Sequence, residues 1–258
     1  MGLELLQFRF SPYNEKARWA LDLKRAPHRR RGLLPGPHMG EVRRLTGRTQ
    51  TPVLVEDGRA LDGSARILAR LEALFPDPPL YPAAPEAREE ALRIERWFDE
   101  DIAPRGRRAV LAALLETPVY FAQVFGRGKS GLARAGYAAV VPFAAPLVRK
   151  GNGIRGPESV EDGLRAFFEG LEFVAARGAR TGFLVGDRLS VADIAAAAAL
   201  ATCVDPPGSP MARPQPMPAS FRSFIDRFAG HPGAAWVRRI YSTHRCAASD
   251  FEGPSDYR

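Results

Sequence analysis

The segment Thr181-Gly182-Phe183-Leu184-Val185-Gly186-Asp187-Arg188-Leu189-Ser190-Val191-Ala192-Asp193-Ile194 carries the most specific folding signal of the chain. It predicts the start of a helix, with Ser190 as the N-cap and Asp193 as the third helical residue. Their side chains can then satisfy each other's backbone N–H groups, which is the arrangement of a capping box. The alanine-rich stretch from Val191 to Val204 is therefore predicted to be a helix, and its apolar character on every side predicts burial.

The region around this segment, residues 85–258, is predicted to form a larger all-helical domain. Apolar residues recur with the helical period in residues 86–115 and 160–176. Because proline lacks an N–H group and clashes with the preceding turn, we expect Pro104 to kink or divide the first of these helices.

The remainder of this domain has weaker patterns. Residues 118–148 favour helix, with expected breaks at Gly126–Gly131 and at Pro142. The chain then ends in a six-proline segment without regular structure, two short helices and a polar tail that we expect to be loosely held, which are residues 206–218, 221–228, 234–241 and those after His244.

Residues 1–76 predict a small α/β domain of the order β-α-β-α-β-β-α. Two short apolar runs flank Asp57-Gly58, which is the strongest short-range signal for a hairpin. The other predicted elements are strands at residues 3–8 and 28–34 and helices from residue 13, at 40–45 and at 64–75. Residues 77–84 are rich in proline and predict a linker between the two domains.

The composition is that of a globular protein with a formal net charge of +8 over 258 residues. Arginines gather at residues 29–31 and 43–48, but no interleaved aromatic residues or recognisable nucleic-acid-binding module accompanies them. We interpret these clusters as solvated surface and expect no nucleic-acid partner.

Two cysteines occur, Cys203 and Cys246, far apart and in no metal-ligand spacing. This usage favours a reducing compartment and predicts neither a disulfide scaffold nor a metal site. The N-terminus lacks a basic segment followed by an apolar one, and no uninterrupted run of about 18 apolar residues occurs. The sequence therefore predicts a cytoplasmic protein without a membrane partner.

The segment Ser11-Pro12-Tyr13-Asn14-Glu15-Lys16-Ala17-Arg18 carries the strongest chemical signal. It joins a predicted strand to a predicted helix, so Ser11 stands where free backbone N–H groups and the positive end of the helix dipole meet. Such a place stabilises an anion, and a thiolate is one. Alternatively, Ser11 is only an N-cap with Pro12 at the first helical position.

Together these segments resemble the glutathione S-transferase superfamily. Phe183-Leu184, Gly186-Asp187, Ser190 and Ala192-Asp193 match the cap of the family's buried helix, and the likeness extends over residues 3–75 and 85–244. The resemblance implies a thioredoxin-like N-terminal domain, a larger C-terminal helical bundle domain and glutathione as the co-substrate.

The resemblance places Ser11 at the thiol-activating position of the serine- and cysteine-type members, including bacterial ones. A hydroxyl there would donate a hydrogen bond to the glutathione thiolate and lower the pKa of the thiol. Tyrosine-type members place a phenol near Phe8, which has no hydroxyl, and Tyr13 is a weaker alternative. Neither Ser11 nor Asn14 is cysteine, so dithiol redox chemistry is not expected.

Two further segments match glutathione-binding positions of the family. Thr51-Pro52 resembles its cis-proline, preceded by Gln50 near the glycyl end of the tripeptide, although an ordinary loop proline is the alternative. Asp62-Gly63-Ser64 resembles its acid-serine pair, in which the serine binds the γ-glutamyl carboxylate at a helix start. Here Gly63 replaces the acid, which stands one residue earlier as Asp62, and either Asp62 or Ser64 is alternatively a plain N-cap.

The acceptor site is expected between the two domains. By location we choose Tyr13, Arg107, Tyr120 and Phe121 as candidate contacts to the substrate, with core packing as the alternative for the aromatic residues. The proline-rich segment 206–218 either covers this cleft or forms a surface loop.

The resemblance thus implies a glutathione transferase-like enzyme that attacks a small hydrophobic electrophile and assembles as a homodimer. Two alternatives stay open. One is a glutathione-dependent isomerase similar to the zeta-type members, and the other is a non-catalytic module that keeps the transferase fold for binding.

Overall fold

A mixed five-stranded sheet forms the centre of the N-terminal domain in the computed structural model, which describes residues 2–211, 213–245 and 253–254. The order of the strands is β4-β3-β1-β2-β5. Only the pairing of β1 with β2 is parallel. The strands are β1 (Leu3–Gln7), β2 (Arg29–Gly32), β3 (Val53–Glu56), β4 (Arg59–Asp62) and β5 (Gly253–Pro254).

The predicted hairpin is present, with Glu56 paired to Arg59 across the turn. Asp57 and Gly58 both have positive φ, 44° and 86°. This is the backbone of the two-residue turn that the Asp-Gly pair favours, because glycine and aspartate tolerate this conformation better than most residues.

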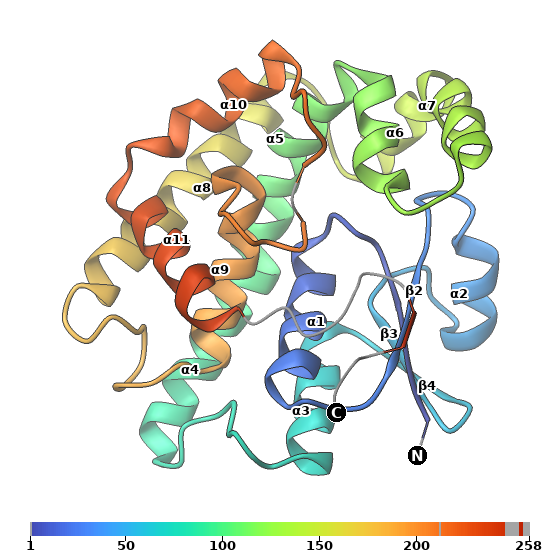
Figure 1. Cartoon of the computed structure of the whole chain (residues 1–258). Helices are drawn as coiled ribbons and strands as arrows, with labels where there is room; N and C mark the ends of the chain where they lie inside the picture. Colours follow the sequence, from blue (N-terminus) through green and yellow to red (C-terminus); the bar gives the residue numbers. More distant parts are fainter. Residues whose placement is uncertain (1, 212, 246–252, 255–258) are drawn as a thin grey trace.

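Helices cover both faces of the sheet (Figure 1). Helices α1 (Pro12–Leu23) and α3 (Ser64–Leu74) pack together on one face, while α2 (Met39–Thr46) lies on the other. The alternation of side chains along β1 explains this arrangement. Leu3 and Leu5 enter the main core, and Leu6 enters a small separate core beneath α2.

The C-terminal domain is helical, as predicted, and the described residues of its proline-rich segment, 206–211 and 213–218, form no helix or strand. Its elements are α4 (Pro85–Trp97), the π-helical turn η1 (Phe98–Ile102), α5 (Ala103–Leu115), α6 (Pro118–Gly126), α7 (Gly131–Gly151), α8 (Pro157–Gly178), α9 (Val191–Val204), α10 (Ala219–Ala229) and α11 (Pro232–His244). The thioredoxin-like domain and the helical bundle domain that the sequence predicts are therefore both confirmed.

The two predicted proline breaks have different outcomes. Pro104 lies in the first turn of α5, directly after the π-helical turn that separates α5 from α4, so the long helix is divided next to this proline. Pro142 does not end a helix, because α7 continues through it. This is possible because Pro142 is exposed, so that water can solvate the carbonyl that loses its helical N–H partner.

Helix α9 is the buried centre of the helical domain, and every one of its residues is buried. Asp193 accepts hydrogen bonds from the backbone N–H groups of Leu184, at 2.8 Å, and Ser190, at 2.9 Å. The aspartate half of the predicted capping box is thus present. Asp193 also holds the loop before the helix, and its burial raises the pKa of the carboxyl to about 6.

The described part of the tail after His244 is firmly packed, which corrects the expectation of a loose tail. Arg245 forms buried ion pairs with Glu15, at 2.6 Å, and with Asp22, at 2.8 Å. Gly253–Pro254 adds strand β5 beside β2. The reason is electrostatic, because Glu15 and Asp22 of α1 are buried carboxylates that attract the Arg245 guanidinium.

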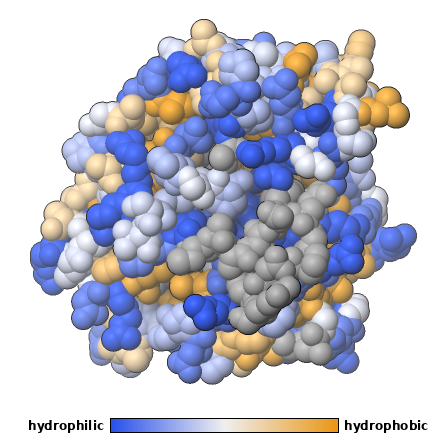
Figure 2. Space-filling model, viewed as in Figure 1, coloured by the Kyte–Doolittle hydropathy of each residue, from blue (hydrophilic) through white to orange (hydrophobic). Residues whose placement is uncertain are grey.

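Helix α7 leaves a strongly apolar face in contact with solvent. Leu132, Val140, Phe143 and Leu147 are all more than half exposed. In Figure 2 hydrophobic surface is visible at the upper right edge of the molecule, where Figure 1 places α7. By length and composition alone α7 could cross a membrane, which the sequence analysis did not anticipate, although a single helix of this kind is a weak indication of a membrane span.

His28, which directly precedes β2, makes the stability of the fold depend on pH. Its Nδ1 donates to the Ala26 carbonyl oxygen at 2.7 Å, and its Nε2 accepts from Arg30 at 2.9 Å, which requires a neutral ring. Burial lowers the pKa of His28 from 6.5 to about 4. Below pH 6.5 the unfolded chain therefore takes up a proton that the folded chain refuses until the pH approaches 4.

We expect the free energy of unfolding to fall by about 2 kcal/mol through this residue as the pH drops from 7 to 4.5. Urea denaturation at both pH values measures the loss in the wild type and in His28→Gln, whose side chain does not titrate. The wild type should lose more stability than the variant. If the wild type and His28→Gln lost the same free energy of unfolding, His28 would take up a proton in the folded state as readily as in the unfolded state.

Candidate functional site

A cavity of about 760 Å³ lies where the two domains meet. The N-terminal domain contributes the loop after β1, the start of α1, the loops before α2 and β3, and the start of α3. The helical domain contributes η1, α5, α6, the end of α7 and one residue of α9. Of the residues predicted from the sequence, the cavity lining contains Ser11, Tyr13, Gln50, Thr51, Pro52, Gly63, Ser64, Arg107 and Phe121.

Ser11 lies at the N-cap of α1 but its side chain does not cap the helix. The residue is extended, with φ −166° and ψ 129°, and its carbonyl oxygen accepts from Glu15 N–H at 2.9 Å. Its hydroxyl makes no capping hydrogen bond and the residue borders the cavity. The purely structural interpretation of Ser11 therefore loses its main support. The first-turn N–H groups of Tyr13 and Asn14 also have no partner within the helix.

Tyr13 borders the cavity with its hydroxyl already engaged. The hydroxyl donates to the carbonyl oxygen of Asp99 in η1 at 2.8 Å. Burial raises the pKa of Tyr13 to about 12, so the phenol keeps its proton at neutral pH. Its role is to hold the start of α1 against the helical domain, and Ser11 is left as the hydroxyl free to act on a ligand.

Thr51-Pro52 has the predicted cis peptide bond. Asn14, buried in α1, donates from Nδ2 to the Thr51 hydroxyl at 3.0 Å, which fixes this loop against the start of α1. Gly63 N–H reaches the Pro52 carbonyl oxygen at 3.3 Å, so α3 is tied to the same loop. These bonds bring three separate segments of the chain together around one end of the cavity, with the exposed Gln50 at its rim.

Ser64 is the first residue of α3 and borders the cavity, as the anion-binding interpretation requires. Gly63 before it has φ +86° and ψ 126°, a conformation that side chains rarely adopt. This backbone explains why glycine, and not an acid, occupies the position. Asp62 lies outside the cavity lining, where its carboxylate pairs with Arg66 at 2.6 Å and with Arg48 at 3.8 Å. The displaced acid is therefore occupied by arginines and does not reach the cavity.

His38 belongs to the cavity and was missed in the sequence analysis. Its Nδ1 accepts from Gly36 N–H at 3.1 Å and its Nε2 donates to the Thr49 carbonyl oxygen at 2.9 Å, so the ring is neutral. Burial lowers the pKa of His38. The ring contacts Phe8 edge to face at 4.6 Å. His38 follows Pro35-Gly36-Pro37, which is typical of a loop, and no motif in the sequence marks it as a site residue.

On the acceptor side, the two aromatic residues of α6 that were predicted to contact the substrate, Tyr120 and Phe121, lie on different sides of the helix. Phe121 borders the cavity, beside Phe125 of the same helix. Tyr120 does not border it, which corrects its assignment as a substrate contact. Tyr120 faces the other side of α6, where its hydroxyl donates to the Pro214 carbonyl oxygen at 3.1 Å and its ring meets Phe221 at 5.7 Å. Adjacent residues of a helix point about 100° apart, so both could not line one cavity wall equally.

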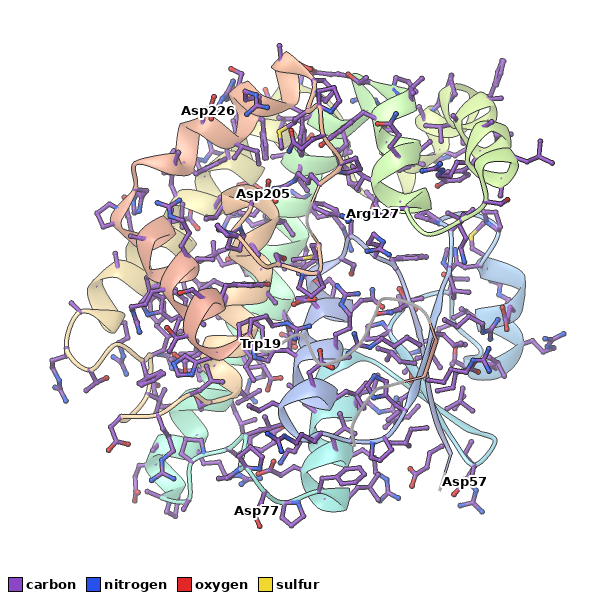
Figure 3. The ribbon with its side chains drawn as sticks, viewed as in Figure 1. Trp19, Asp57, Asp77, Arg127, Asp205 and Asp226 are labelled. Atoms are coloured by element: carbon purple, nitrogen blue, oxygen red, sulfur yellow. The ribbon has the colours of Figure 1, made fainter. Side chains whose placement is uncertain are left out.

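No described residue of the segment 206–218 is in the cavity lining, but Arg213 of this segment supports the cavity wall from behind. Arg213 lies 5.2 Å from the ring centres of both Phe10 and Phe221 and pairs with Asp205 at 2.6 Å. Phe10 in turn borders the cavity. Figure 3 shows Asp205 at the end of α9, where this segment begins.

Cys203 is buried in α9, and burial raises the pKa of its thiol, so it is not a reactive group of the site. Cys246 lies outside the described residues. Within the part of the chain that the structure describes, no three His, Cys, Asp or Glu side chains are grouped to hold a metal ion.

Two family models match the chain. Residues 5–79 match "Glutathione S-transferase, N-terminal domain", and residues 157–239 match "Glutathione S-transferase, C-terminal domain". Together they cover more than half of the sequence. No curated protein matches the chain at a significant level.

Many solved structures share the fold at low sequence identity. A glutathione S-transferase from Rhodospirillum rubrum is 22% identical, with a TM-score of 0.60 over 93% of this chain and 88% of that one. A glutathione S-transferase from Methylobacillus flagellatus with glutathione bound is 18% identical, with a TM-score of 0.63 over 93% and 95%. The Beta-etherase LigF from Sphingobium sp. is 20% identical, with a TM-score of 0.59 over 93% and 99%.

Proposed function

The chain belongs to the glutathione S-transferase superfamily, and from this premise we propose that it binds glutathione, ionises its thiol beside Ser11 and transfers the sulfur to an electrophilic carbon. The observation that carries this proposal is the Ser11 hydroxyl. It stands at a helix start, makes no capping hydrogen bond and borders a cavity between the domains.

The N-terminal half of the cavity suits the tripeptide. The free N–H groups at the start of α3, with Ser64, would hold the γ-glutamyl carboxylate. The backbone of Thr51, fixed by Asn14, would pair with the cysteinyl part, and Gln50 would contact the glycyl end. Because Asp62 is engaged by arginines, the glutathione ammonium would be held without that carboxylate.

The chemical step follows from this placement. The thiol releases its proton to water, and the thiolate is stabilised by the Ser11 hydroxyl and the first-turn N–H groups of α1. The sulfur electron pair then forms a carbon–sulfur bond, and the acceptor either expels a leaving group or takes up a proton. In the isomerase alternative the same thiolate adds and is later expelled, so the glutathione site is common to both activities.

Two measurements test the proposal together. Calorimetric titration should show glutathione binding, and 1-chloro-2,4-dinitrobenzene with glutathione should release chloride faster than in the absence of protein. Binding without conversion of this and other electrophiles would leave a non-catalytic module. Absence of binding would contradict the proposal itself.

A further inference from the structure

Helix α5 carries three arginines within four residues, and their surroundings differ sharply. Arg105 pairs with Asp162 at 2.9 Å, with Glu169 at 2.8 Å and with Asp101 at 3.2 Å. Arg108 pairs with Asp162 at 3.1 Å. Arg107 has no ion pair with any described residue, and its buried Nε has no hydrogen-bond partner there either.

Arg107 is also the one of these three arginines that borders the cavity. It is close enough to Tyr13 for its charge to act on the phenol, which places it on the side of the cavity where α1 begins. The residue is half-buried, and its Nε–H group has lost water without gaining a protein acceptor, which is costly. A ligand carrying an anion would remove that cost.

The other charged groups of the cavity lining do not supply this anion. The Asp99 carboxylate binds Lys16 Nζ at 2.5 Å. Arg66, on the far side at the start of α3, pairs with Asp62. His38 is neutral in its hydrogen-bonded tautomer. Among the described residues that line the cavity, the acceptor half therefore holds one cationic side chain without an ion pair, that of Arg107.

The surroundings of Arg107 are otherwise apolar. Val110 and Leu111 follow it by three and four residues, so they lie on the same face of α5, and both border the cavity. Phe121 and Phe125 of α6 complete this wall. A ligand that fits here has an apolar or aromatic body and one anionic group at the end that reaches α5.

We propose that the acceptor site takes electrophiles that carry a carboxylate, with Arg107 binding the carboxylate and the α5–α6 wall binding the apolar body. This rests on the proposed function, and it names the substrate class of the same site. A guanidinium suits this task because its N–H groups match both oxygens of a carboxylate and it stays charged at every relevant pH.

The test compares 4-chloro-3-nitrobenzoate with 4-chloro-3-nitrobenzamide. In both, the glutathione sulfur forms a bond to the carbon that bears chlorine, chloride leaves with the electrons of its bond, and the thiol proton goes to water. The two acceptors differ in charge at one end only. Rates are corrected for the reaction without protein, because the amide is intrinsically the more reactive of the pair.

After this correction we expect kcat/KM to favour the benzoate by about ten-fold, the effect of one charged hydrogen-bonded contact. Arg107→Met should lower kcat/KM for the benzoate about ten-fold and change that for the benzamide less than three-fold. Arg107→Lys should keep part of the preference. The matched control Arg108→Met removes the same charge from the same helix outside the cavity lining and should leave the preference intact.

Equal losses with both acceptors in Arg107→Met would overturn the proposal, since they would mean that Arg107 acts on the thiolate. So would a wild type that converts the benzamide without favouring the benzoate, and in that case the transferase activity itself would stand. If neither acceptor is converted although glutathione binds, titration with the two S-aryl glutathione products decides. Tighter binding of the carboxylate product, lost in Arg107→Met, supports the proposal, and equal binding contradicts it.

Discussion

Replacing Ser11 by alanine should lower kcat/KM for sulfur transfer at pH 7 by about two orders of magnitude. The free thiol has a pKa near 9, and the hydroxyl together with the first-turn N–H groups of α1 should bring it towards neutrality. Each unit of that shift changes the thiolate fraction about ten-fold. The Ser11 hydroxyl has no capping role in the fold, so its removal should leave the free energy of unfolding nearly unchanged.

The distinguishing measurement is the pH profile. The thiolate of bound glutathione, followed by its ultraviolet absorbance, should titrate at higher pH in Ser11→Ala than in the wild type. Activity of the variant should therefore recover as the pH rises, while the affinity for glutathione changes little. Ser11→Thr, which keeps a hydroxyl, should retain much of the activity. If Ser11→Ala kept wild-type activity and an unshifted thiol titration, the thiolate would be stabilised by a group other than Ser11.

Tyr13→Phe separates the two hydroxyls of this turn. Because the Tyr13 hydroxyl donates to the Asp99 carbonyl oxygen and keeps its proton, the phenylalanine variant should not show the shifted titration expected of Ser11→Ala. It thereby serves as the control for a general disturbance at the start of α1.

Features encoded by neighbouring residues could be predicted from the sequence. The Asp57-Gly58 hairpin and the cap of α9 depend on residues within a few positions of one another, and both are present. Ser11 was likewise singled out from its place at a predicted strand-to-helix turn, whereas the binding role of Ser64, at a predicted helix start, came from the family resemblance. In each case the backbone geometry follows from local sequence, so no knowledge of the packing was needed.

Features that depend on distant segments could not be predicted in this way. Arg245 meets Glu15 only because the chain returns to α1 after the whole helical domain. The side of α6 that faces the cavity, which admits Phe121 and excludes Tyr120, is set by how α6 packs and not by its apolar pattern. His38 and the isolation of Arg107 are of the same kind, because they depend on which partners three-dimensional packing supplies.

The interface between the two domains shows how such packing supports the site. Trp19 of α1 lies between α1 and the helical domain in Figure 3, with its ring 4.8 Å from that of Tyr241 and its N–H donating to the His244 carbonyl oxygen at 3.2 Å. On the same helix Lys16 reaches Glu95 and Asp99. Helix α1, whose first turn carries Ser11, is thus held by the helical domain at several points.

Lys16→Met should remove about 3–5 kcal/mol from the free energy of unfolding, because it leaves a buried carboxylate without its cation. Lys16 Nζ lies 2.8 Å from Glu95 and 2.5 Å from Asp99, and the Lys16 and Glu95 side chains are only 1% and 3% exposed. Burial already raises the pKa of Glu95 in the presence of this cation. Without it the carboxyl should take up a proton more readily, so the loss should be smaller at pH 5 than at pH 8.

Urea denaturation of a double-mutant cycle measures this coupling. Lys16→Met combined with Glu95→Met removes both charges of the more deeply buried ion pair. The double variant should recover a large part of the stability, because two apolar side chains need no partner. The exposed pair of Arg93 and Glu90, 2.8 Å apart on the same helix α4, provides the contrast. Arg93→Met should cost less than about 1 kcal/mol, since water screens that pair. If Lys16→Met lost as little free energy of unfolding as Arg93→Met, water would reach the interface between the domains, and α1 would be positioned by its apolar contacts alone.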